Sequence, residues 1–287
     1  MILRHNIKRD LESEYPAAEK KLEKYNGQFD YYMSTGKKIN LWGFKNTSLR
    51  YATYSIVLNR NEKTREALKY YLEFGIGHFK RMVSNDKTTE ITVNNKIYEV
   101  SSLESRNELT YFNWWNLFII ATIIKCENLI RELIRIHQNV DFNECQDKFW
   151  NQVSKYSLKL FLEEKSDEEL YSNIKEDANS GMVQFYGLEE DKLIYSNELK
   201  FLRCKIWLPI IELQRLISRR EDNLFNEKLR EYIEFKKAWI INQKEQDNSS
   251  YWVDFSILYC CILAQNNKIE IKIESDYIPK FVVDGEF

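Results

Sequence analysis

The chain has 287 residues, of which 44% are apolar and 30% are charged, and only eight are glycine and three proline. This balance is typical of a soluble globular protein and excludes an intrinsically disordered chain. The net charge of −2 gives no general attraction to nucleic acid or to an anionic membrane, so we expect neither as a direct partner. The scarcity of turn-forming residues favours long helices over a many-stranded sheet.

The sequence also bears on the compartment in which the protein works. The first eight residues lack the apolar run of about 7–15 residues that marks a secretory signal peptide. No segment reaches the ~18 consecutive apolar residues that a membrane-spanning helix needs. The five cysteines are odd in number and irregularly spaced, which indicates free thiols in a reducing compartment. We therefore expect a cytoplasmic protein.

Apolar residues recur at helical spacing along most of the chain. The first helical region covers about residues 4–33, and Pro16 is expected to start a second helix there after a short break. Ser166 and Glu169 have the spacing of a capping box at the start of a later helix. Pro209 predicts a kink or break in another. The further helices are expected at residues 41–59, 63–83, 103–124, 127–137, 146–162, 166–178, 188–219, 223–246 and 251–265.

A short β-prone stretch interrupts the helices at residues 90–100. Asn94 and Asn95 stand between two apolar runs, and because Asn tolerates positive φ we expect a tight hairpin. A two-residue loop sets Val93 opposite Lys96, whereas a three-residue loop sets it opposite Ile97. The second register is preferred because it forms an apolar cross-strand pair.

The C-terminal region contains the most apolar helix and the clearest strand pattern. The helix at residues 251–265 is apolar on nearly all sides, which predicts a central place in the core. Residues 268–274 then alternate strictly, with Ile269, Ile271 and Ile273 on one face, and predict a strand that extends the hairpin into a small sheet. The expected fold is a mainly α, multi-helix globular bundle with one small β-hairpin and a short C-terminal strand.

The expected organisation is a single domain over residues 1–287. Residues 1–40 form an N-terminal helical extension, and the sequence leaves their assignment to that domain open.

Motifs for catalysis, cofactors and metals are absent from the sequence. His5, His78 and His137 are far apart, and no zinc-binding or phosphate-binding motif occurs. Cys260 and Cys261 would point about 100° apart on a helix, as core thiols do. His137 lies near a helix C-terminus, where the dipole favours a partly cationic imidazole. We expect no catalytic, cofactor or metal site; the alternative is an enzyme whose site assembles from distant carboxylates and tyrosines.

Two neighbouring stretches carry opposite charge. Residues 163–191 hold ten acidic residues against two lysines, and residues 200–220 hold six basic residues against Glu212 alone. Either these are solvated faces that oppose one another, or the acidic run binds a basic partner, since complementary charge speeds association and selects partners. The candidate partner-binding surface comprises Glu163, Glu164, Asp167, Glu168, Glu169, Glu189, Glu190 and Asp191.

The order of features near the C-terminus resembles one known family. An aromatic-led apolar helix from Tyr251 ends in Leu263-Ala264 and a polar turn, followed by the alternating run and by Ser275-Asp276-Tyr277-Ile278-Pro279. This order is similar to that of the immunity protein 49 family of bacterial polymorphic toxin systems. The upstream order of helices, hairpin and Trp114-Trp115 helix extends the similarity over residues 42–279. The helix from Leu49 to Val57 and the helix with Trp114 and Trp115 match in pattern rather than residue by residue.

The resemblance implies an immunity protein that is not an enzyme. Such a protein would bind a cognate toxin, for which a nuclease is one candidate, and neutralise it by stoichiometric occlusion. The Tyr277-Ile278-Pro279 ending is expected to pack the tail down rather than to touch the toxin. The alternative function is that of a helical protein-interaction adaptor unrelated to toxins.

Overall fold

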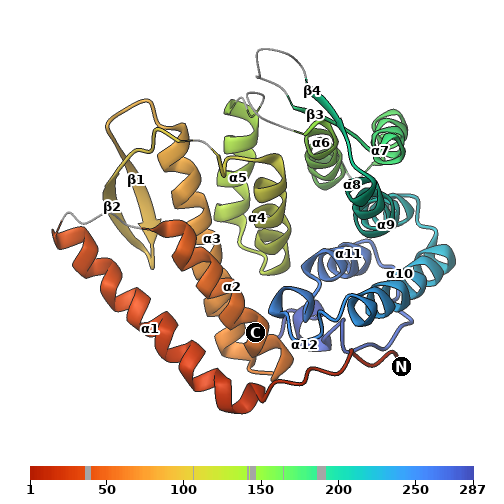
Figure 1. Ribbon diagram of the computed structural model, residues 1–287, viewed down its shortest axis with the longest axis horizontal. Coiled ribbons are helices and arrows are strands. Elements are labelled where there is room, and N and C mark those ends of the chain that lie inside the picture. Colours follow the sequence, from red (N-terminus) through yellow and green to blue (C-terminus); the bar gives the residue numbers. More distant parts are fainter. Residues whose placement is uncertain (36–39, 106, 141, 143–146, 164, 186–191) are drawn as a thin grey trace.

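The computed structural model describes residues 1–35, 40–105, 107–140, 142, 147–163, 165–185 and 192–287. Within these ranges the expected mainly α fold is confirmed (Figure 1). The α-helices are α1 (Leu11–Thr35), α2 (Leu41–Val57), α3 (Asn61–Val83), α4 (Tyr111–Ile123), α5 (Glu127–Asn139), α6 (Lys148–Glu163), α7 (Glu168–Ser180), α8 (Asn197–Leu202), α9 (Leu208–Ser218), α10 (Asp222–Asn242), α11 (Phe255–Asn266) and α12 (Lys280–Val283). The other elements are β1 (Thr88–Val93), β2 (Lys96–Ser101), β3 (Met182–Phe185), β4 (Lys192–Tyr195), a π-helical segment (Arg203–Trp207) and a 3₁₀ turn (Ser249–Tyr251).

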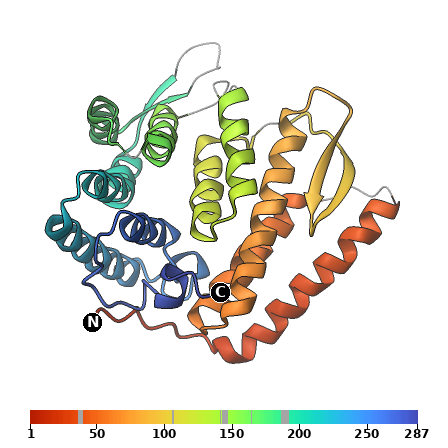
Figure 2. The same ribbon diagram turned by 180° about the vertical axis from the view of Figure 1, so that it is seen from behind.

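Consecutive helices pack in pairs, namely α2 with α3, α4 with α5, α6 with α7 and α9 with α10. Figure 1 shows these pairs following one another along an arc, and Figure 2 shows the same order from behind. Helix α1 lies along α2, and the β1–β2 hairpin rests on α3. An isolated hairpin is marginal in water, so contact with α3 stabilises it.

Helix α11 has the central position that its all-round apolar sequence predicts. It packs against α4, α9 and α12, and its residues from Ile257 to Ala264 are buried. Asp254 caps its N-terminus, because the carboxylate accepts hydrogen bonds from the N–H groups of Ser256 and Ile257. The helix therefore begins at Phe255 rather than at Tyr251, and Trp252 enters the core from the turn before it.

The predicted hairpin is present, but the preferred register is wrong. Val93 pairs with Lys96 across a two-residue loop, and Thr92 pairs with Ile97. Both Asn94 and Asn95 have positive φ, at 50° and 62°, the geometry of a tight turn whose twist matches that of the strands. The turn decides the register, and Ile97 is left 69% exposed on the outer face.

The C-terminal strand is the other error. Residues 269–274 belong to no sheet in the described part of the chain and do not pair with β1 or β2, and Lys268 is a turn residue with a φ of 63°. A single parallel bridge joins Ile2 to Ser275 just beyond them. A second hairpin, β3–β4, was not expected, because Lys192–Tyr195 falls in a stretch whose pattern predicts an amphipathic helix.

Two helix starts also differ from expectation. Pro16 lies inside α1 rather than after a break. Helix α7 is capped by Asp167, whose side chain accepts from the Leu170 N–H, so Ser166 does not form the predicted capping box. The expected break at Pro209 is confirmed as the junction between the π-helical segment and α9.

Candidate partner-binding surface

The structure describes four of the eight acidic residues proposed from the sequence. Glu163 is exposed at the end of α6, Asp167 caps α7, and Glu168 and Glu169 lie in the first turn of α7. Glu164, Glu189, Glu190 and Asp191 lie outside the described residues.

Two of the four are engaged within the protein. The Asp167 carboxylate also accepts a hydrogen bond from the Lys159 ammonium at 2.8 Å. The hydrogen bond from the Leu170 N–H, and then the one from Lys159, lowers the pKa of this carboxyl. Glu168 pairs with Arg215 at 2.9 Å and with Arg219 at 2.8 Å. Burial alone would raise the pKa of Glu168, but hydrogen bonds from Ser166 and Arg215 outweigh it and lower that pKa.

The acidic and basic runs therefore oppose one another at this point, as one of the two sequence interpretations expected. Glu163 and Glu169 differ from their neighbours, because neither forms an ion pair with any described residue and both are exposed. These two glutamates can therefore pair with a basic residue of a partner without first breaking an ion pair within the protein.

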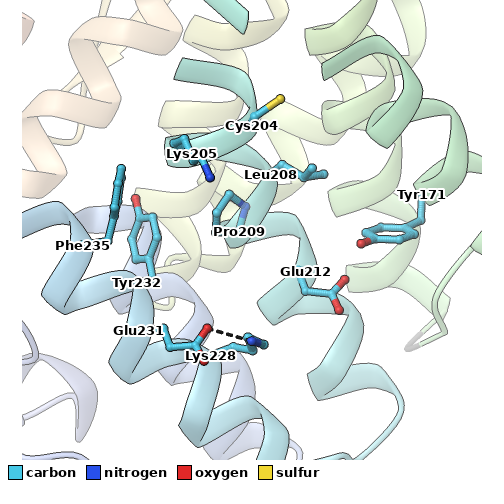
Figure 3. A pocket seen from close by; sticks show the side chains of 10 residues that line it. All are labelled: Tyr171, Cys204, Lys205, Leu208, Pro209, Glu212, Lys228, Glu231, Tyr232 and Phe235. Carbon is cyan, nitrogen blue, oxygen red and sulfur yellow. Dashed lines mark hydrogen bonds and ion pairs between the residues drawn. The ribbon is translucent and has the colours of Figure 1, made fainter. Parts of the chain in front are cut away.

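Beside this acidic surface lies a groove of about 350 Å³ between α7, the π-helical segment with the start of α9, and α10 (Figure 3). Its apolar part is formed by Leu208, Pro209, Tyr232 and Phe235. Its polar part is formed by Tyr171, Cys204, Lys205, Glu212, Lys228 and Glu231. An apolar floor with a few polar groups at the edge is the usual composition of a binding site for a side chain or small ligand.

The groove owes its shape to the π-helical segment. The Leu208 N–H bonds to the Arg203 carbonyl, five residues back, and Pro209 has no N–H with which to continue a regular ladder. Such π-bulges insert a residue into a helix and occur often at functional sites. Here the bulge directly precedes Leu208 and Pro209 in the floor of the groove and includes Cys204 and Lys205 at its edge.

Tyr171 and Glu212 face one another across the groove (Figure 3). Burial, and then a hydrogen bond to the Glu212 carboxylate, raises the pKa of the Tyr171 hydroxyl. The Arg215 guanidinium lies 4.7 Å from the centre of the Tyr171 ring. One carboxylate oxygen of Glu212 pairs with Arg215 at 3.3 Å. The other oxygen, Oε2, is buried, so Glu212 is part of the groove wall and is held there by its neighbours Tyr171 and Arg215.

Two exposed aromatic side chains lie on β4 and α8, and the one on α8 adjoins the groove. Tyr195 and Phe201 are 53% and 39% exposed, and the Phe201 ring lies 6.3 Å from that of Phe235 in the groove wall. Exposed aromatic residues beside a pocket are typical anchors of protein–protein interfaces. Sequence reasoning missed this surface, because its residues come from α7, α8, α9 and α10, and only Pro209 signalled a local irregularity.

Arg203, part of the basic run, has a structural place instead. Its side chain is fully buried, pairs with Asp147 at 2.5 Å and donates to the Met182 carbonyl at 2.7 Å. It therefore ties the π-helical segment to the residue before α6 and to the start of β3.

One buried group of ionisable residues lies elsewhere, between α2, α3 and the segment before α4. Lys45 is only 4% exposed, its ammonium lies 3.2 Å from the centre of the Trp42 ring, and burial lowers its pKa to about 7. His78 lies 3.8 Å from Glu108, and burial lowers its pKa to about 4. So little exposed surface gives a substrate no route to Lys45.

His137 corrects a prediction. Burial, with Lys155 adding to it, lowers its pKa to about 4, so the imidazole is neutral at pH 7 rather than partly cationic. Its Nε2 lies 3.1 Å from the Ser154 hydroxyl and its ring 4.4 Å from that of Trp114. Desolvation outweighs the helix dipole at this position.

Among the residues that the structure describes, no three His, Cys, Asp or Glu side chains are grouped to hold a metal ion. Cys126, Cys204, Cys260 and Cys261 are free thiols, and the last two are buried in α11. In the same described ranges no helix combines the length and the apolar character needed to cross a membrane.

Comparisons with known proteins give one match. No curated protein and no solved structure is detectably similar to the chain. The family model described as Immunity protein 49 matches residues 59–282, from the end of α2 to α12. This match covers most of the chain, and the protein therefore belongs to the immunity protein 49 family.

Proposed function

We propose that this protein binds a cognate bacterial toxin in the cytoplasm and neutralises it by stoichiometric occlusion. The observation that carries the proposal is the family match over residues 59–282. Occlusion is a binding function, and it requires a surface with anchors rather than a reactive centre. On this proposal residues 1–287 act as one unit, which the continuous cluster of buried side chains from Leu11 to Val283 supports.

We place the toxin on the face formed by α7, α8, the π-helical segment and α10. Three features support this choice: the exposed aromatic residues Tyr195 and Phe201, the groove between α7, α9 and α10, and the free acidic residues Glu163 and Glu169. Aromatic anchors would supply most of the binding energy, and the acidic rim would steer a basic partner such as a nuclease cleft. A standard interface of about 800 Å² per partner would cover this face.

The test of neutralisation is co-expression with the toxin encoded beside this protein. Cells should survive when both are made, die when the toxin is made alone, and yield a one-to-one complex on purification. Death in the presence of well-expressed immunity protein would reject neutralisation.

The test of the surface is charge reversal at the two free carboxylates, Glu163→Lys with Glu169→Lys. Because both side chains are exposed and form no ion pair with a described residue, folding should be unaffected, while the affinity for a basic toxin should fall about tenfold or more and become less salt-dependent. The matched control is Glu227→Lys, an exposed glutamate on α10. Equal effects of both variants would place the toxin elsewhere and leave neutralisation standing.

A further inference from the structure

The segment Ile269–Glu274, most of the predicted strand, follows Lys268, a turn residue with a φ of 63° at the end of α11. Its side chains alternate as a strand's do: Ile269 and Ile273 are 2% and 6% exposed and join the core, while the charged residues between them are exposed. It lies beside the N-terminus, which occupies the periphery of the molecule in both views (Figures 1 and 2).

One edge of this segment is already hydrogen-bonded. Asn226 of α10 donates to the Glu270 carbonyl at 2.9 Å and accepts from the Lys272 N–H at 2.7 Å, so its side-chain amide stands in for a neighbouring strand. The Ile2 N–H then donates to the Glu274 carbonyl at 2.8 Å. All three contacts involve even-numbered residues of the segment.

The other edge is open. Successive residues of an extended chain direct their backbone groups to opposite edges, so those of Ile269, Ile271 and Ile273 point away from Asn226. In the described structure no hydrogen bond reaches the N–H or C=O of Ile271 or Ile273. A cavity of about 900 Å³ borders the segment along Ile269–Glu274. An open strand edge is a template for another strand.

The order of charges identifies which strand fits. When the sequence Ile269-Glu270-Ile271-Lys272-Ile273 is laid antiparallel on a copy of itself about Ile271, Glu270 of each copy faces Lys272 of the other. Every isoleucine then faces an isoleucine. Shifting the register by two residues in either direction places Glu270 opposite Glu270 or Lys272 opposite Lys272, and like charges directly opposite one another are destabilising.

The hydrogen-bonding edge selects the same register. Pairing about Ile271 sets odd-numbered residues against odd-numbered residues, and these are the residues whose backbone groups face the open edge. The Ile271 N–H of each copy reaches the Ile271 carbonyl of the other, and the Ile273 N–H reaches the Ile269 carbonyl. We propose that a second copy of this chain binds here, and that the protein forms a two-fold symmetric dimer through antiparallel pairing of Ile269–Ile273.

The test begins with sedimentation of the untagged protein at concentrations of about 1–100 μM, a range that suits a small interface. The wild-type protein should shift from monomer to dimer over this range. Glu270→Lys places a lysine opposite Lys272 twice in the symmetric pair, and Lys272→Glu sets two glutamates together in the same way. Each variant should weaken dimerisation about tenfold or more, with an unchanged melting temperature because both side chains are exposed.

Mixing the two variants provides the decisive control. One variant has lysine at both positions 270 and 272, and the other has glutamate at both. In a mixed pair each of these lysines therefore faces a glutamate. A heterodimer should therefore form where each variant alone stays monomeric. The double variant Glu270→Lys with Lys272→Glu should likewise recover the homodimer. A wild-type protein that stays monomeric, a dimer that tolerates Glu270→Lys, or a mixture that fails to associate would each overturn the proposal. None of these outcomes depends on toxin binding.

Discussion

The Arg203 guanidinium and the Asp147 carboxylate form an ion pair 2.5 Å long in the interior, although 56 residues separate them in sequence. The same guanidinium lies 5.1 Å from the centre of the Phe149 ring and donates to the Met182 carbonyl. A charge this deeply buried is tolerated only while its partners remain in place. The pair therefore fixes where the π-helical segment sits, and with it the floor of the groove.

Replacing Arg203 should unfold the protein more readily than replacing an exposed arginine. Arg203→Ala leaves Asp147 and the Met182 carbonyl without their donor, and we expect a loss of about 3–5 kcal/mol in the free energy of unfolding, measured in urea. The control is Arg230→Ala on α10, where the side chain is exposed and the change should stay within about 0.5 kcal/mol. A similar small change at Arg203 would mean that the pair does not hold this region together.

Helices were predictable along most of the chain because apolar spacing is a local signal. Helix α3 was expected at residues 63–83 and occupies Asn61–Val83, and α11 took the central position that its composition required. The errors arose where interactions between distant residues, or two competing local interactions, decide the structure. Two adjacent Asn residues at positive φ set the hairpin register against the apolar pairing, and no local pattern announces that Asn226 takes the place of a strand beside Glu270.

The candidate surface was predictable only in its charge. The sequence showed opposed acidic and basic runs, yet the pairing of Glu168 with Arg215 and Arg219 depends on how α7 packs against α9. The groove depends further on α10 and on the π-helical segment. Its residues are spread over several helices, so no single stretch of sequence contains the pattern.

Lys45 should make stability depend on alkaline pH. Its pKa is about 7 in the folded protein and about 10.5 when unfolded, so the unfolded chain binds the proton more strongly between these values. The loss in unfolding free energy that results from burying the charged ammonium is therefore largest below pH 7, and it disappears as the pH rises toward 10.5. Each unit of pKa depression corresponds to about 1.4 kcal/mol, so burying the charged form costs several kcal/mol. The contact of the ammonium with the Trp42 ring offsets about 2 kcal/mol of that cost.

Lys45→Met keeps the volume and removes the charge. We expect the variant to exceed the wild type by about 2–3 kcal/mol in unfolding free energy at pH 6–7, and the difference to shrink progressively by pH 10. Urea unfolding of both proteins across this range is the measurement. A difference that does not change with pH would show that Lys45 titrates normally.

Two glycines in α3 should respond in opposite directions to the same substitution. A Cβ at Gly75 would lie 2.4 Å from Cδ2 of the buried Leu117, whereas a Cβ at Gly77 would meet nothing closer than 3.4 Å. Alanine favours a helix over glycine by about 1 kcal/mol, but overpacking a core costs about 1–3 kcal/mol. Gly75→Ala should therefore lower the melting temperature and Gly77→Ala should raise it; a rise in both would show that α4 yields easily to α3.

Glu212 offers the sharpest test of the groove within the proposed complex. Its carboxylate lines the groove, so its negative charge would attract a cationic side chain of a toxin that enters there. Glu212→Gln preserves shape and removes the charge, and toxin affinity measured by calorimetry should fall about tenfold or more. Arg215 keeps its bond to Glu168, so the fold should persist, which the melting temperature checks. Glu227→Gln, at an exposed position of α10, is the matched control and should bind as the wild type does; equal affinity of the Glu212 variant would move the toxin contact away from the groove.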